Sequence, residues 1–370
     1  MGENIVSMSK RNVTIDILKG IGIISIVVGH ACWEVKIGNL SFPIGPFVYL
    51  YHLTIFFFCA GYCYKADSID NYLIKKIKSL YIPFILYSLV FLIFRNLFLK
   101  LGILDGIPYS FEDLIIVVTN ILTFNGNGEF LSAFWFLPVL FGALIIFCII
   151  DQILKKTNVL KVTAIILILF LGYIGLYSME HHFGLLLNMQ VAYLMIPIVT
   201  IGYMYKRKEE FINKLINIFT FIACLVIMVG LLYRNIGIIE LSKFMIISKS
   251  LFYPVSFIGI LFCLSLAKII SKHEWFKRLF SYIGVYSFDI MALHFLSFKI
   301  VDLLYYLISR KPCVMSAFPY SYNEMRVVYV IVGIAFPVFL KKLFMQFKKY
   351  LNKNILLEIK SKLEENHLNN

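Results

Sequence analysis

Residues 15–34 form the run IDILKGIGIISIVVGHACWE, which is apolar along most of its length and contains Asp16, Lys19 and His30. A helix that crosses a bilayer needs about 17–25 predominantly apolar residues, so this run is long enough to span. Nine further runs of similar character follow, over residues 47–64, 81–99, 132–151, 160–178, 186–205, 215–233, 246–270, 284–306 and 327–347. We therefore predict an all-α fold, a polytopic membrane protein with about ten transmembrane helices embedded in the lipid bilayer.

The overall composition agrees with this class. Of 370 residues, 60% are hydrophobic and only 15% are charged, against about 25% charged in an average soluble domain. The mean hydropathy is +0.84. This composition excludes a disordered chain, because there is ample apolar surface to bury. It also argues against a soluble globule, which would have to hide too much Phe, Ile and Leu in one or two cores.

The distribution of basic residues predicts the orientation. The chain has 35 Lys and Arg against 21 Asp and Glu, a formal net charge of +14. With the N-terminus in the cytoplasm, 24 Lys and Arg fall in cytoplasmic segments and 7 in outside segments, which is the bias expected of cytoplasmic loops. An even number of spans then places both termini in the cytoplasm. The charge is mostly a topology signal, and without a recognition motif it gives no reason to expect a nucleic acid partner.

The chain shows no internal repeat, and we predict a single transmembrane domain over residues 1–347. Residues 348–370 are polar and typical of a helical cytoplasmic tail that lies along the membrane surface. Residues 111–124 are apolar but too short to span, so we interpret them as a re-entrant or interfacial helix. The Asn-Gly-Asn-Gly sequence at 125–128 predicts a turn after it.

Ionisable side chains inside a span are costly, so each needs a partner or a function. Lys19 and His30 are 11 residues apart, which separates them by about 20° around a helix and about 16 Å along its axis. Asp16 lies three residues before Lys19, a spacing that allows an ion pair. One helix face thus carries a cation near the cytoplasm and an imidazole deeper in the membrane. The structural alternative is that Lys19 extends to the membrane surface and His30 only hydrogen-bonds a neighbouring helix.

Other polar side chains lie at comparable depth. His52 is near the outer end of the second span, and Trp135 begins the fourth span directly after a segment that contains Glu129. The ninth span carries Asp289 and His294, which are five residues apart and so do not share a face. Trp135 is alternatively an ordinary interfacial aromatic residue, and Glu129 a solvated loop residue.

A metal site is not expected. The seven cysteines contain no C-x-x-C pair and act as small apolar side chains. Adjacent histidines at His181 and His182 follow Glu180, but no third ligand is evident. The chain also lacks a glycine-rich phosphate loop and the usual hydrolase motifs.

Five motifs together carry a resemblance to a known family. Asp16-x-x-Lys19-Gly20-Ile21 followed by His30 resembles the first-helix signature of the acyltransferase-3 family, which is a basic residue, ten residues and a histidine. Four later segments of the chain resemble the later motifs of the family, in the same order. They are Tyr51-His52 through Gly61-Tyr62, Lys75 through Pro83, Trp135-Phe136-Leu137 and Tyr286-Ser287 through His294.

The chain departs from the family pattern at four positions. Lys19 stands where many members carry Arg. A lysine ammonium offers a phosphate one positive charge, but it lacks the two parallel N–H donors of an arginine guanidinium. Thr54 and Ala60 replace a common Pro and a common Ser, and Met291 occupies a position that is usually Tyr. These changes resemble those of the sugar-acetylase branch.

The resemblance implies a membrane O-acyltransferase. Members take an acyl group, commonly acetyl, from cytoplasmic acetyl-CoA or another acyl-CoA and place it on a hydroxyl of a cell-surface carbohydrate or lipid-linked sugar. The Lys- and Ile-rich composition fits a bacterial source, so we expect a multi-pass protein of the bacterial cytoplasmic membrane. No metal is expected beside the acyl-CoA co-substrate.

Roles for individual residues follow from this resemblance together with their chemistry. His30 would deprotonate the acceptor hydroxyl or mediate acyl passage, and Lys19, beside Asp16, would attract the CoA diphosphate or polarise the thioester carbonyl. The clusters at 75–78 and 206–208 would steer the CoA phosphates. The residues expected to bind CoA are Lys19, Lys75, Lys76 and Lys78. Those expected in the acceptor pocket are His52, Glu129, Trp135 and His294.

Two other classes remain as alternatives. An ion-coupled transporter of a small solute would also carry charges such as Asp16, Lys19, Asp289 and Lys299 in its spans. Transporters often consist of two related halves, which this sequence does not show. The third class is a membrane scaffold or regulator that has lost its chemistry.

Overall fold

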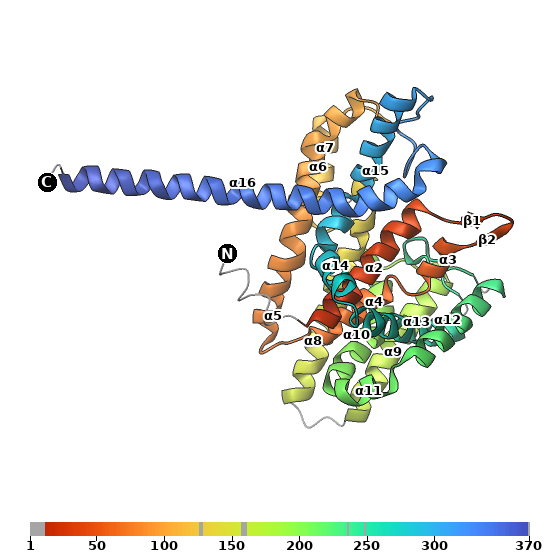
Figure 1. Cartoon of the computed structure of the whole chain (residues 1–370). Helices are drawn as coiled ribbons and strands as arrows, with labels where there is room; N and C mark the ends of the chain where they lie inside the picture. The colour runs from red at the N-terminus through yellow and green to blue at the C-terminus, as the bar shows by residue number, and fades with distance from the viewer. Residues whose placement is uncertain (1–11, 126–128, 157–160, 235–236, 248, 369–370) are drawn as a thin grey trace.

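The computed structural model describes residues 12–125, 129–156, 161–234, 237–247 and 249–368 (Figure 1). Side chains are described up to Leu351, apart from those of residues 37, 129 and 161. The helices are α2 (Val13–Ala31), α3 (Ile44–Tyr49), α4 (Thr54–Tyr62), α5 (Ile69–Lys76), α6 (Ile82–Lys100), α7 (Phe111–Leu122), α8 (Phe136–Lys156), α9 (Lys161–Glu180), α10 (Met189–Arg207), α11 (Glu209–Leu215), α12 (Ile218–Tyr233), α13 (Lys249–Ile270), α14 (Glu274–Val285), α15 (Ser287–Ser309) and α16 (Arg326–Leu368). Strands β1 (Val35–Ile37) and β2 (Leu40–Phe42) pair as an antiparallel hairpin with Val35 opposite Phe42.

The number of spans agrees with the sequence. Within the described residues, nine helical segments are long and apolar enough to cross a membrane, and the pair α11 and α12 makes a tenth if its 74° bend lies within one span. The all-α, polytopic fold with about ten transmembrane helices is therefore confirmed. The cytoplasmic location of both termini stays a prediction from the Lys and Arg distribution.

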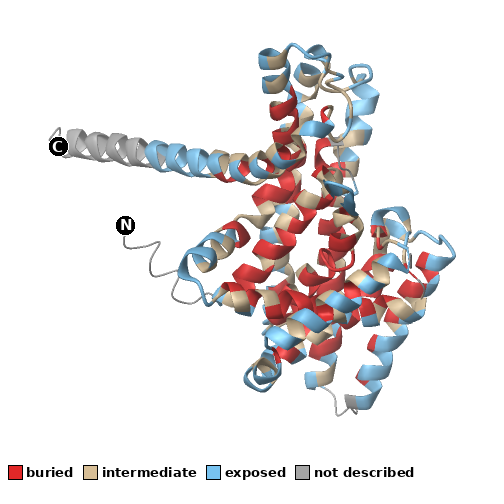
Figure 2. Cartoon of the chain, turned by 45° about the vertical axis from the view of Figure 1, so that its right-hand side comes forward, coloured by how far each residue is buried: buried red, intermediate tan, exposed pale blue. Residues whose placement is uncertain are grey.

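Helix α2 lies at the centre of the bundle and packs against α3, α4, α13, α14, α15 and α16. Asn12 starts it, because its side-chain oxygen accepts the N–H groups of Thr14 and Ile15. Figure 2 shows buried residues concentrated in the central helices, with exposed residues at the periphery. The first apolar run of the chain is thus the core helix, and the functional side chains it carries are held from several sides.

Two pairs of glycines bring helix backbones into direct contact. A Cβ atom on Gly20 would lie 2.2 Å from the carbonyl oxygen of Phe280, and one on Gly284 would lie 1.8 Å from that of Asp16. Helices α2 and α14 therefore meet without side chains between them. The same holds for α4 and α10, where a Cβ on Gly61 would lie 1.9 Å from the Val199 carbonyl oxygen. Small residues at helix crossings permit this close approach in membranes.

The second predicted span falls on one helical segment, Ile44–Tyr62, which is long and apolar enough to cross a membrane. It comprises α3 and α4, with a turn at residues 50–53 between them. Nδ1 of His52 lies 3.0 Å from the Val48 carbonyl oxygen, and the Thr54 hydroxyl donates to the Tyr51 carbonyl oxygen at 2.9 Å. The backbone keeps helical hydrogen bonds through this turn, since the His52 N–H donates to the Val48 carbonyl oxygen at 2.9 Å and the Ile55 N–H to that of Tyr51 at 3.1 Å. His52 therefore sits where α3 leads into α4, within one membrane-spanning segment.

Four other segments bear on the sequence interpretation. The basic segment around 75–78, expected as a loop, is helical, because α5 continues through a π-helical stretch at Ile77–Tyr81 into α6. Helix α7 exists where a short helix was expected, although its position relative to the bilayer stays a prediction. The turn expected at 125–128 falls mostly outside the described residues. Helix α16 runs past residue 347 without a break, so the tail is helical through Leu368 while the domain boundary stays a prediction.

Candidate functional site

Helix α2 borders two cavities, one near each of its ends. We call the first the lysine cavity, because it is lined by Lys19, Lys76 and Lys206, and it has a volume of about 670 Å³. We call the second the histidine cavity, because it is lined by His30 and His52, and it has a volume of about 960 Å³. The unbroken α2 helix confirms the predicted placement of Lys19 and His30 along one element, each facing a different cavity.

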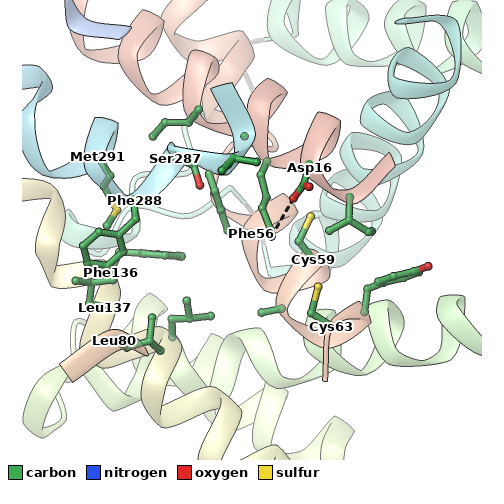
Figure 3. A pocket seen from close by; sticks show the side chains of 18 of the residues that line it. Asp16, Phe56, Cys59, Cys63, Leu80, Phe136, Leu137, Ser287, Phe288 and Met291 are labelled. Atoms are coloured by element: carbon green, nitrogen blue, oxygen red, sulfur yellow. Dashed lines mark ion pairs between the residues drawn. The ribbon is translucent and has the colours of Figure 1, made fainter. Parts of the chain in front are cut away.

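The lysine cavity concentrates positive charge around one carboxylate. Nζ of Lys19 lies 3.6 Å from Oδ1 of Asp16, as the three-residue spacing predicted (Figure 3). Lys76 from α5 lies with its ammonium 5.0 Å from the centre of the Tyr72 ring, and Lys206 from α10 also reaches the wall. Three amines against one acid give the cavity a net positive charge, which suits a polyanionic ligand.

The predicted basic cluster is divided by the helical geometry of its segment. Of the three lysines at 75–78, only Lys76 lines the lysine cavity, whereas Lys75 and Lys78 are exposed and do not line it. Consecutive residues of a helix point in different directions, since each turns by about 100°. Of the three, only Lys76 is thus placed at the cavity wall, and the role of these lysines in CoA binding stays a prediction.

Within the histidine cavity, aromatic rings and polar groups alternate along the wall. Trp33, Tyr49 and Trp135 supply the rings, and Asn188 and Glu240 supply polar side chains. Trp135 thus lies where the sequence analysis placed it. The backbone of residue 129 begins the 3-10 segment that leads to α8, but the side chain of Glu129 lies outside the described part of the chain.

His30 is hydrogen-bonded to His294, which comes from α15. Nδ1 of His30 lies 2.9 Å from Nε2 of His294. Nδ1 of His294 lies 3.1 Å from the Ile290 carbonyl oxygen and 3.0 Å from the Met291 carbonyl oxygen. His294 is completely buried and does not line the cavity. It therefore supports His30 from behind instead of facing an acceptor directly.

These contacts fix the positions of the ring hydrogens. A carbonyl oxygen only accepts hydrogen bonds, so Nδ1 of neutral His294 carries its hydrogen and Nε2 is an acceptor. Nδ1 of His30 must then be the donor to that nitrogen, which leaves Nε2 of neutral His30 unprotonated. Among the described residues, Nε2 of His30 has no hydrogen-bond partner. The chain of bonds thus prepares a basic nitrogen on the wall of the histidine cavity.

His52 lines the same cavity with a ring oriented by its own backbone. Its Nδ1 faces the Val48 carbonyl oxygen at 3.0 Å, so it is the donor and Nε2 is an acceptor. The ring centre lies 4.5 Å from that of Tyr49. His52 is therefore a second basic nitrogen of the cavity, without a supporting histidine behind it. Across the described residues, no three His, Cys, Asp or Glu side chains come together in a way that would hold a metal ion.

A comparison with protein families decides the identity of the chain. The family described as "Acyltransferase domain", acyltransferase-3, matches residues 12–342, from the start of α2 into α16. The chain belongs to the acyltransferase-3 family. The protein is thus a membrane acyltransferase with several membrane-spanning helices. Comparison with curated proteins and with solved structures gives no match.

Two residues that border both cavities were not identified from the sequence as lying between the same two cavities. Phe136 and Met291 line both cavities, and no other described residue does. Both lay within recognised motifs, but they lie on α8 and α15, two helices that are far apart in the sequence. The only available signal was that Phe136 follows Trp135 directly and that Met291 replaces a usual tyrosine.

Two further pairs of opposite charges lie within the spans of the acyltransferase. Asp289 accepts the hydroxyl of Tyr87 at 2.7 Å and lies 2.8 Å from Nζ of Lys341. Nζ of Lys299 lies 3.7 Å from Oδ2 of Asp302. Asp289 and His294 thus have different partners, as their five-residue spacing predicted. The pair of Asp289 and Lys341 joins α15 to α16, whereas Lys299 and Asp302 both lie on α15.

Proposed function

We propose that this protein transfers an acyl group, acetyl in the simplest case, from acyl-CoA to a hydroxyl of a carbohydrate or lipid-linked sugar, with His30 as the general base. The observation that carries the proposal is the chain of hydrogen bonds from the Ile290 and Met291 carbonyl oxygens through His294 to His30. It leaves Nε2 of His30 able to accept a proton. An alcohol becomes a competent nucleophile when such a base removes its proton.

The transfer proceeds in two steps. The acceptor hydroxyl gives its proton to Nε2 of His30 while its oxygen attacks the thioester carbonyl carbon. The tetrahedral intermediate collapses when the C–S bond breaks, and the leaving thiolate takes the proton from Nε2. The products are an O-acyl ester and free CoA thiol, with His30 again neutral. Nε2 of His294 keeps a lone pair toward His30, so it stabilises the imidazolium that forms between the steps.

The lysine cavity is the proposed site of the CoA phosphates. Lys19, Lys76 and Lys206 outnumber Asp16 on its wall, so they attract a diphosphate. Lys19 and His30 are separated by about 16 Å along α2. An acyl-CoA with its phosphates at the lysines would extend its flexible arm along α2 and bring the thioester to His30.

The histidine cavity is the proposed site of the acceptor. Trp33, Tyr49 and Trp135 offer apolar faces to the C–H surface of a sugar ring, and Asn188 and Glu240 offer hydrogen bonds to its hydroxyls. Small-molecule sites commonly combine apolar walls with a few polar groups that fix orientation. This lining supports a carbohydrate acceptor.

The proposed orientation places the lysine cavity toward the cytoplasm of a bacterial cell, where acyl-CoA is made. The excess of Lys and Arg in the predicted cytoplasmic segments supports this direction. The histidine cavity would then open toward the outside, and the acyl group would be delivered on that side. In this arrangement the protein moves the acyl group across the membrane while CoA stays in the cytoplasm.

The decisive experiment uses inverted membrane vesicles from cells that produce the protein. Acetyl-CoA labelled in its acetyl group is added outside the vesicles, and label in the carbohydrate fraction is measured with wild type and with His30→Ala. We expect label in carbohydrate with the wild type and loss to background with His30→Ala at equal protein level. Lys100→Ala, which changes an exposed lysine at the far end of α6, serves as the control.

Two results would overturn the proposal. Equal labelling of carbohydrate by wild type and His30→Ala would remove His30 from the reaction. Accumulation of an unmodified solute that collapses with the ion gradient, with no ester formed, would instead indicate a transporter. The intramembrane charges that suggested transport are paired in the structure, as Asp16 with Lys19 and Asp289 with Lys341.

A further inference from the structure

Phe136 and Met291 lie between the two cavities. Each side chain contributes to both walls, so the barrier at this point is one side chain thick. Figure 3 shows the two residues close together at one end of the lysine cavity. Both are largely buried, each with 6% of its surface exposed. A ligand that occupies both cavities at once must pass between them.

The two sides of this barrier differ in mobility. The Phe136 ring packs edge-on against Phe57, with ring centres 5.3 Å apart, and against Phe56 at 5.9 Å. Met291 has an unbranched side chain with three rotatable bonds, which adapts its shape at little cost. The aromatic side is therefore fixed by α4, and the methionine is the part that can move.

The barrier is also next to the proposed base. The Met291 carbonyl oxygen lies 3.0 Å from Nδ1 of His294, whose Nε2 faces His30 at 2.9 Å. Met291 and His294 are three residues apart on α15, so they lie on adjacent turns of one face. A group that has passed Met291 has therefore reached the level of the His30 and His294 pair.

We propose that Phe136 and Met291 form a gate that the thioester end of acyl-CoA must pass, and that this gate limits the size of the acyl group transferred. The inference rests on the proposed function, since it assumes that acyl-CoA enters through the lysine cavity and reacts at His30. The acyl group enters the gap ahead of the thioester sulfur, so the width of the acyl group decides whether it passes, before any reaction. A linear acyl group, which is no wider than the arm that follows it, passes when Met291 swings aside, and a branched group meets the fixed Phe136 ring.

The test compares donors of different size in one assay. Vesicles carrying wild type, Met291→Ala, Met291→Phe or Leu140→Ala are given acetyl-CoA and isobutyryl-CoA in separate reactions, and the ratio of the two transfer rates is determined. Leu140 lies one turn beyond Phe136 on α8 and lines only the lysine cavity, so it controls for a general gain of space. We expect Met291→Ala to raise the isobutyryl-to-acetyl ratio about tenfold, and Leu140→Ala to leave this ratio unchanged. Met291→Phe should slow both donors.

A second measurement tests passage through the gate and does not depend on acyl transfer. Cys63 is exposed and lines the lysine cavity, so its thiol reports on passage from the other side. A small, membrane-impermeant methanethiosulfonate is added on the histidine-cavity side, and modification of the Cys63 peptide is followed by mass spectrometry. We expect faster modification in Met291→Ala than in wild type and slower modification in Met291→Phe.

The outcomes separate the two proposals. An unchanged donor ratio in Met291→Ala, or equal Cys63 modification in wild type and both Met291 variants, would overturn the gate while leaving acyl transfer in place. A wild type that transfers no acyl group from any acyl-CoA would overturn the proposed function, and the Cys63 rates would still decide whether the barrier opens at Met291.

Discussion

Nδ1 of His30 lies 2.9 Å from Nε2 of His294, a residue 264 positions later in the chain. The second histidine is held in turn by two backbone carbonyl oxygens, so the hydrogens of both rings have fixed positions. The arrangement does for His30 what a buried carboxylate does for the histidine of a serine hydrolase, which is to set the tautomer and orient the ring. Here the final acceptors are carbonyl oxygens instead of a carboxylate.

The first prediction concerns this pair. His294→Leu removes the acceptor of the His30 hydrogen bond, so we expect a loss of transfer rate of about 100-fold, within the usual contribution of a positioned base. His294→Gln places an amide oxygen near the lost Nε2 and should restore part of the rate. The measurement is the transfer rate at saturating acyl-CoA across a range of pH.

A merely structural role for His294 would give a different result. In that case His294→Gln and His294→Leu would lower the amount of folded protein alike, and the pH profile per folded molecule would match that of the wild type. Recovery of rate by Gln together with a changed profile for Leu is the outcome that the hydrogen-bond chain requires.

The second prediction concerns the lysine cavity. Lys19→Ala and Lys76→Ala each remove a charge from its wall, so we expect the KM for acyl-CoA to rise about tenfold to 100-fold, as for the loss of one hydrogen bond to a charged group. Lys75→Ala and Lys78→Ala remove exposed charges outside the cavity and should change the KM less than twofold. Initial rates at varied acyl-CoA concentration measure both sets. A KM that rises equally in all four variants would mean that the CoA phosphates interact with the basic segment as a whole, and not with the lysines of the cavity wall in particular.

The third prediction concerns the contact between α2 and α14. Gly284→Ala would force a Cβ atom onto the Asp16 carbonyl oxygen, so we expect a loss of at least about 2 kcal/mol in the free energy of unfolding. Gly230→Ala on α12 is the matched control, because no atom lies within 4 Å of its added Cβ. That substitution should be neutral or stabilise by about 0.5–1 kcal/mol. Thermal unfolding in detergent compares them, and similar melting temperatures would refute the contact.

The fourth prediction concerns the segment that carries Phe318 and Pro319 to the histidine cavity. Asp302 accepts the Ser321 N–H at 3.1 Å and lies 3.7 Å from Nζ of Lys299, with both side chains buried. Asp302→Ala breaks this buried pair, so we expect a loss of about 3–5 kcal/mol in stability. The KM for the acceptor should rise, and the KM for acyl-CoA should stay the same.

The control for this prediction is an ion pair on the same segment. Lys311 lies 3.0 Å from Glu324, and both are exposed, so Lys311→Ala should cost less than about 1 kcal/mol. A rise in the KM for acyl-CoA equal to that for the acceptor would show that Asp302 supports the whole bundle and not this segment.

Much of the fold was predictable, because span length and helical spacing are local properties of the chain. The ten apolar runs, the shared face of Lys19 and His30, and the pairing of Asp16 with Lys19 all follow from distances of a few residues. The turn at residues 50–53 between α3 and α4 was not predictable in this way, because the apolar character of the sequence continues through it.

Individual residues of the candidate site could be predicted from the sequence, but the contacts between them could not. His30 and His294 were each singled out as polar groups in apolar spans, yet nothing local indicates that they touch. In the sequence the three lysines at 75–78 look equivalent. Only the direction in which each side chain leaves the helix distinguishes Lys76, which lines the lysine cavity, from Lys75 and Lys78. The contact of Phe136 and Met291 with both cavities depends on the packing of two distant helices, which no spacing rule within one helix describes.

The glycine contacts at Gly20, Gly284 and Gly61 give the protein a stiff frame. At these glycines the helix backbones touch with no side chain between them. Rocking one half of the bundle against the other would therefore bring main-chain atoms into steric clash. Solute carriers depend on such rocking. Under the proposed function, a frame that resists this rocking leaves transfer across the membrane to the flexible arm of acyl-CoA, which extends along α2 while the helices keep their places.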